Sequence, residues 1–69
     1  MIVFNIETEQ ETDGRWIAEV TELSGVMCYG ASQDEAIAKV QALALRDVAD
    51  QLEHDEATGG LLSISFNAA

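Results

Sequence analysis

Residues 32–53 read SQDEAIAKVQALALRDVADQLE and carry the long helical pattern of the chain. Ser32 and Glu35 match a capping box, in which the serine hydroxyl accepts a hydrogen bond from the Glu35 amide and the Glu35 carboxylate reaches back. Apolar residues then recur at helical spacing, at Ile37, Val40, Ala44, Val48 and Leu52, and the stripe is widened by Leu43 and Leu45. The pattern predicts a helix from Gln33 to Leu52 or Glu53 that packs on one face of a sheet.

Three short strands are expected before this helix. Residues 2–7 and 15–20 alternate in polarity, which is the two-residue period of a half-buried strand. The polar residues 8–14 between them are expected to form a loop ending in Asp13-Gly14, a pair that favours a hairpin turn. Residues 26–29 form a short third strand, ended by Gly30. The inward positions are Ile2, Phe4 and Ile6 on the first strand and Trp16, Ala18 and Val20 on the second.

A fourth strand is expected at residues 61–66, after a turn containing Gly59 and Gly60. The order is therefore β-β-β-α-β. A helix linking two strands of one sheet makes a right-handed crossover, which lays the last strand parallel to its neighbour. Docking beside the first strand gives sheet order 3-2-1-4, counting strands along the chain. The sequence thus predicts one α+β domain over residues 1–69, with a helix on one face and Val3, Ile17 and Leu61 on the other, a face too apolar to be left fully in water.

The charge of the chain is strongly unbalanced, with 13 Asp and Glu against 3 Lys and Arg and a net charge of −10. Nucleic acids and anionic membranes are bound chiefly through Lys and Arg, so neither is expected as a direct partner. A basic protein would instead be attracted. Solubility is the alternative reason for the acidity, because net charge alone identifies neither a fold nor a partner.

The length of the chain points to self-association. A chain of 69 residues buries too little surface for a lone core to stabilise it strongly. Its single cysteine, Cys28, excludes an internal disulfide and a cysteine-cluster zinc site, which leaves a dimer or larger homo-oligomer as the expected remedy. Residues 1–7 lack the basic region of a signal peptide, so a cytoplasmic location is expected.

No group of side chains forms a convincing catalytic, metal or cofactor site. His54 follows the expected helix, where a positive group is favourable, and Cys28 has no basic neighbour in sequence. The carboxylates of the first hairpin are an alternative cation site, namely Glu7, Glu9, Glu11 and Asp13. A calcium loop, however, needs a tighter pattern of oxygen ligands than these residues offer. Phosphate-binding, dinucleotide and nucleophilic-serine motifs are absent from the sequence. The protein is therefore expected not to be an enzyme and to use no cofactor.

Partner-binding residues are expected on the second and third strands and in the loop between them. Large amphipathic aromatic side chains anchor many interfaces, and the chain has two of them. The candidate set joins these to nearby carboxylates and to one outward isoleucine: Trp16, Ile17, Glu19, Glu22 and Tyr29. Core packing is the alternative role for both aromatic residues.

Three segments in this order resemble the HicB family of antitoxins, namely residues 13–20 (DGRWIAEV), 23–26 (LSGV) and 30–36 (GASQDEA). The family reads as an aromatic-x-Ala strand, a loop ending in Leu-Pro-Gly, and Gly-x-Thr followed by Glu-Ala at a helix start. The resemblance covers nearly the whole chain, because the family core has the same β-β-β-α-β order. It implies a partial RNase H-like fold without the catalytic acids, assembly as a dimer or larger, and inhibition of a small basic HicA-type ribonuclease toxin by covering its active site.

The chain also departs from the family pattern. Thr21 and Ser24 stand where the family often has proline. Many members continue into a C-terminal DNA-binding domain, whereas this sequence ends at Ala69, so operator binding is not expected. Two functions stay open: a HicB-like antitoxin domain that neutralises a basic ribonuclease toxin, and an orphan homo-oligomeric structural or regulatory protein of the same fold.

Overall fold

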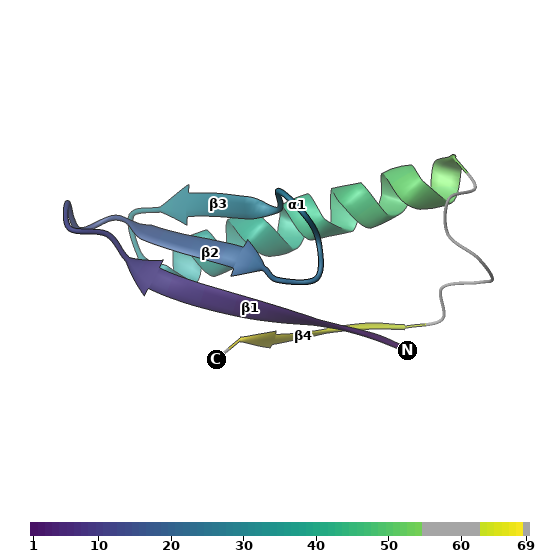
Figure 1. The fold of residues 1–69 in the computed structure, drawn as a ribbon, viewed down its shortest axis with the longest axis horizontal. Helices are drawn as coiled ribbons and strands as arrows, with labels where there is room; N and C mark the ends of the chain where they lie inside the picture. The colour runs from purple at the N-terminus through teal and green to yellow at the C-terminus, as the bar shows by residue number, and fades with distance from the viewer. Residues whose placement is uncertain (55–62, 69) are drawn as a thin grey trace.

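A computed structural model of the chain describes residues 1–54 and 63–68. Its elements are β1 (Ile2–Gln10), β2 (Trp16–Val20), β3 (Met27–Gly30), α1 (Gln33–Glu53) and β4 (Ile64–Ala68). They form one four-stranded sheet of order β3-β2-β1-β4, in which β4 is parallel to β1 and the other pairs are antiparallel. Figure 1 shows α1 on one side of this sheet, with β4 at the edge beyond β1. The predicted α+β layout and strand order are confirmed.

The first hairpin differs from its prediction in the length of β1, which continues through residues 8–10 to pair with β2. A hydrogen bond from the Glu11 amide to the Arg15 carbonyl (2.7 Å) closes the hairpin, and Gly14 makes the turn at φ 92°. The loop prediction for residues 8–10 was wrong because it followed their polar side chains. Strand pairing uses the backbone, and an antiparallel strand with one face in water accepts polar residues.

The other strand ends also move slightly from their expected places. β2 begins at Trp16 and β3 at Met27, each one residue later than predicted. β4 reaches Ala68 instead of ending at Phe66, because Asn67 and Ala68 still pair with β1. The expected turn at Gly59-Gly60 and the expected strand start at residues 61–62 lie outside the described residues.

The core lies between α1 and the sheet. The helix contributes Ala36, Val40, Ala44 and Val48, and the strands and the β2–β3 loop contribute Phe4, Ile6, Ala18, Val20 and Val26. Trp16, Cys28, Ile37, Leu43, Ile64 and Phe66 are half-buried around it. The predicted alternation of β1 and β2 is thus confirmed at their centres, while Ile2, at the strand start, is 37 % exposed.

Two leucines expected in the core stripe of the helix are not there. Leu45 is 48 % exposed and Leu52 is 40 % exposed. Successive helical residues are about 100° apart, so Leu45 points well away from the line of buried residues that contains Ala44. Alanines at the contact bring the helix close to the sheet and keep the covered strip narrow. The prediction was wrong because it assigned too wide a face of the helix to the core.

The helix begins as its sequence predicts. Ser32 is the N-cap residue, and its hydroxyl accepts a hydrogen bond from the Glu35 amide at 3.1 Å. The Glu35 carboxylate, expected to reach back, instead accepts a hydrogen bond from Lys39 Nζ at 2.9 Å. Half of the predicted capping box is therefore present, and an ion pair four residues along the helix replaces the other half.

β3 meets the first turn of the helix at Gly30. A Cβ atom at this position would lie 2.5 Å from the Ala36 nitrogen and 2.9 Å from its Cα. Real Cβ atoms essentially never approach backbone atoms this closely. Only glycine therefore allows the helix to lie this near the end of β3.

Candidate partner-binding site

One face of the sheet, here called the open face, is left uncovered by α1. Residues that alternate with the buried ones point to it: Val3, Asn5, Glu7 and Glu9 from β1, Ile17 and Glu19 from β2, Met27 and Tyr29 from β3, and Ser65 and Asn67 from β4. Strand pairing arranges them in rows across the sheet, one of which is Glu9–Ile17–Tyr29 and the next Glu7–Glu19–Met27. Acidic and apolar side chains are therefore neighbours on this face.

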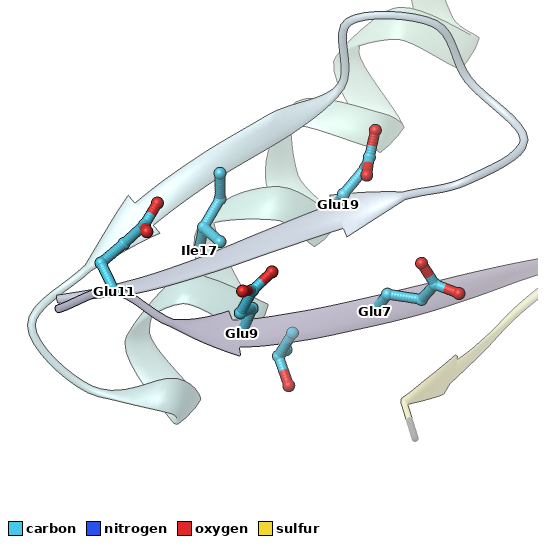
Figure 2. A pocket seen from close by; sticks show the side chains of 6 residues that line it. Glu7, Glu9, Glu11, Ile17 and Glu19 are labelled. Carbon is cyan, nitrogen blue, oxygen red and sulfur yellow. The ribbon is translucent and has the colours of Figure 1, made fainter.

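The centre of the open face is a shallow hollow of about 420 Å³ with strongly acidic walls. It is lined by Glu7, Thr8, Glu9, Glu11, Ile17 and Glu19. Figure 2 shows the four carboxylates around Ile17 on the same side of the hairpin. Glu7 and Glu19 stand directly opposite each other on paired strands, an arrangement that is destabilising for like charges. A cation placed between them would relieve that repulsion.

At the hairpin end of the open face, Tyr29 is held between opposite charges. The Arg15 guanidinium lies over its ring, 4.5 Å from the centroid, and its hydroxyl donates a long hydrogen bond of 3.4 Å to Glu11. Arg15 is fixed in turn by Asp13, whose carboxylate accepts hydrogen bonds from the Arg15 backbone amide (3.0 Å) and Nε (2.8 Å). These bonds lower the pKa of Asp13. Tyr29 is thus a half-exposed aromatic surface in a fixed position beside the hollow.

At the other end, Glu22 completes the pairing of β1. Its carboxylate accepts hydrogen bonds from the Asn5 backbone amide (2.8 Å) and from Asn5 Nδ2 (2.6 Å). The Thr21 amide donates to the Asn5 carbonyl at 3.1 Å, which keeps the loop alongside β1. The backbone amide of Asn5, followed by its side-chain amide, lowers the pKa of Glu22. Glu22 therefore holds the loop to the sheet as a carboxylate.

Acid should weaken the protein partly through Glu22. A carboxylate whose pKa is lowered by folding adds stability above its ordinary value of 4.5, and this contribution is lost as the pH falls through the lowered value. Glu22→Gln is therefore expected to lose less stability than the wild type between pH 6 and 3, measured as the urea midpoint at each pH. Glu9→Gln, which removes one charge from the open face, is the control and should keep the wild-type acid dependence. A Glu22→Gln curve parallel to that of the wild type would contradict this role.

The structure brings together only part of the predicted partner-binding set. Ile17, Glu19 and Tyr29 share the open face. Trp16 lies on the opposite face, half-buried against the core, and Glu22 is bonded to Asn5. In their place β1 supplies Glu7 and Glu9, while Glu11 follows at the hairpin. Sequence reasoning left these three out of the set because it placed the last two in a loop, and the alternation of residues 7, 9 and 11 was the signal that could have found them.

The residues singled out for possible chemistry lie apart from one another. Cys28 is half-buried against the core, and His54 caps the helix, with Nδ1 2.8 Å from the Asp50 carbonyl oxygen. Within residues 1–54 and 63–68, no three His, Cys, Asp or Glu side chains are grouped to hold a metal ion. The part of the chain that the structure describes also includes no helix with the length and apolarity to cross a membrane. No protein-family model matches the chain, and comparisons with curated proteins and with solved structures found no significant match.

Proposed function

We propose that this protein is a HicB-like antitoxin domain, which binds a small basic HicA-type ribonuclease toxin and neutralises it by covering its active site. The observation that carries the proposal is the acidic hollow, where four carboxylates surround Ile17 on a rigid sheet. A ribonuclease holds RNA phosphates with Lys and Arg side chains. A surface that presents several carboxylates close together can pair with the Lys and Arg side chains that would otherwise bind RNA phosphates. Such a surface therefore excludes RNA from the active site.

The distribution of the few cations supports this proposal. Lys39 and Arg46 belong to α1, on the other layer of the molecule, and Arg15 is already paired with Asp13. The hollow itself is lined by four glutamates, Thr8 and Ile17, so every charged side chain in its lining is acidic. Steering of this kind raises the association rate with a basic partner and falls with ionic strength.

The apolar residues of the open face are expected to supply most of the binding affinity. Tyr29 and Met27 are each 44 % exposed; Tyr29 is paired with Ile17, and Met27 is paired with Glu19 in the next row. Interfaces derive most of their affinity from a few buried aromatic and aliphatic anchors, while rim charges set the rate and the partner. The toxin would therefore bury Ile17, Met27 and Tyr29 and pair its basic residues with the acids around them.

The resemblance of residues 13–36 to HicB antitoxins is consistent with this reading, because the family has the same order of elements. Binding here requires no catalytic group, so the protein would act without enzymatic activity or cofactor, in the cytoplasm. The second candidate is an orphan homo-oligomeric structural or regulatory protein of this fold. It is favoured by the exposed leucines of α1, which lie away from the open face.

Co-expression with a short basic protein encoded beside this gene tests the proposal. The two chains are expected to co-purify, and adding this protein is expected to abolish the ribonuclease activity of the neighbour at equimolar ratio. An unrelated basic ribonuclease serves as the control and should keep its activity, since charge alone does not fix the geometry of the contact. Full ribonuclease activity in the presence of excess antitoxin candidate would overturn the proposal.

A further inference from the structure

β3 forms one edge of the sheet, and part of its backbone points outward from that edge. Between β2 and β3 the Val20 amide donates to the Val26 carbonyl at 3.0 Å. Bonded and non-bonded positions alternate along an antiparallel ladder, so Met27 and Tyr29, one and three residues further along, are not bonded to β2. Their amide and carbonyl groups face the free edge, where the part of the chain that the structure describes offers them no backbone partner.

This edge lacks most of the features that keep strands from pairing with other chains. Such features are charged side chains, proline, bulges and a covering element. β3 (MCYG) contains neither charge nor proline, and its register with β2 runs without a bulge. Tyr29 leans away from the edge, because its ring contacts Arg15 and its hydroxyl reaches Glu11 in the first hairpin. The edge is therefore open to a further strand, although four residues limit the contact to a short one.

The charges around the β3 edge favour a basic segment. Glu19 lies directly opposite Met27 on β2. Asp34 and Glu35 lie in the first turn of α1, which packs against the end of β3. The nearest cation on the helix, Lys39, is already paired with Glu35 at 2.9 Å. An acidic strand would be repelled here, and a basic one attracted.

The opposite edge of the sheet, formed by β4, has different side chains beside it. β4 also lacks charge and proline, but it places only the uncharged Ser65 and Asn67 on the open face. Asn67 already donates a hydrogen bond to Asn5 at 3.3 Å. The exposed apolar side chains of Met27 and Tyr29, by contrast, lie at the β3 side. A partner docked on the open face would therefore reach the β3 edge by extending past these two residues.

We propose, as an extension of the proposed function and resting on it, that the basic partner adds an extended strand to the outer edge of β3. In an antiparallel arrangement two of its residues, two positions apart, would each exchange two backbone hydrogen bonds with Met27 or Tyr29. The side chains of these two partner residues would lie on the open face, beside the acidic hollow. Strand addition of this kind supplies affinity through the main chain and specificity through alternate side chains.

Proline tests the edge, because it removes an amide donor and is tolerated in an edge strand where that amide faces outward. Met27→Pro is compared with Met27→Ala, which removes the same side chain and keeps the amide. In titrations with the short basic protein encoded beside this gene, Met27→Pro is expected to bind at least about ten-fold more weakly than Met27→Ala.

Ala68→Pro is the matched control on the other edge of the sheet. The Ile2 amide donates to the Ser63 carbonyl at 3.0 Å, so along the parallel pair the odd-numbered residues of β4 face β1 and the Ala68 amide faces outward. The same backbone change therefore falls on an outer edge, and the affinity for the basic protein should stay at the wild-type value.

Amide hydrogen exchange of the wild type, followed by NMR, keeps the test decisive if Met27→Pro does not fold. The Met27 and Tyr29 amides are expected to exchange rapidly in the free protein and at least about ten-fold more slowly in the complex. Slow exchange of both amides in the free protein would mean that the edge is already occupied, by a second copy or by the chain itself, and would overturn the inference.

Binding without protection of these amides, equal affinities for Met27→Pro and Met27→Ala, or an equal loss in Ala68→Pro would also overturn it. Each of these results leaves the proposed function standing, because the partner still binds. Absence of binding by the wild type would overturn the proposed function, and this inference with it.

Discussion

Gly30→Ala is expected to lower the free energy of unfolding by about 3 kcal/mol, the upper part of the range for overpacking a tight contact. The added methyl group would lie 2.5–3.0 Å from backbone atoms of Glu35 and Ala36. Backbone atoms cannot swing aside as a flexible side chain does, so α1 must move off β3. A domain of this size has roughly 3–10 kcal/mol of total stability, at 0.05–0.15 kcal/mol per residue. The variant should therefore be close to unfolding.

Urea titration followed by circular dichroism measures this effect, and Gly14→Ala is its control. Gly14 has φ 92° but open space where a Cβ would lie, so alanine there costs only backbone strain of about 1 kcal/mol. Gly14→Asn should be milder still, because asparagine tolerates positive φ. Equal stabilities for Gly30→Ala and the wild type would show that the helix does not approach β3 this closely.

The double reversal Glu7→Lys/Glu19→Lys is expected to slow association with the basic toxin on the order of 100-fold at low salt, within the range of steering effects. Each reversal adds two positive charges, so the net charge changes from −10 to −6. The two residues remain a like-charged pair across the strands, so folding stability should change little. Stopped-flow mixing at low and high salt measures the rate, and the loss should shrink as salt screens the charges.

The matched control is Asp50→Lys/Glu53→Lys, which makes the same change in net charge on exposed helix residues. It should slow association only several-fold, because these positions lie on the other layer. Glu22 is left out of the test, since its reversal would also break the hydrogen bonds to Asn5. If both double variants slowed binding equally, net charge rather than the acidic hollow would account for the attraction.

The architecture could be predicted because periodicity and connection rules suffice for it. Alternation marked the first two strands, apolar residues at helical spacing marked α1, and the crossover rule placed β4 beside β1. The predictions were wrong where the polarity of a side chain did not match its structural environment. Residues 8–10 are polar but paired, and Leu45 is apolar but exposed.

The candidate site was predicted less completely for a related reason. Once β1 is known to reach Gln10, alternation places Glu9 beside Ile17 on the open face, so the acidic hollow follows from register. The bond between Glu22 and Asn5 joins residues 17 positions apart through a loop path that no local pattern specifies. The space between Gly30 and the helix backbone depends on how closely α1 packs against the sheet. That packing distance cannot be predicted from a local sequence pattern.

The position of β4 determines when β1 can become paired on both sides during synthesis. β1 is an interior strand, yet one of its two neighbours is drawn from residues 64–68, and Phe66 stacks near Phe4 with ring centroids 5.7 Å apart. During synthesis the meander and helix emerge first, and one side of β1 stays unpaired until residues 64–68 have left the ribosome. A protease cut between α1 and β4 would likewise turn β4 into a detachable peptide. Loss of that peptide would expose the edge of a central strand to pairing with other chains.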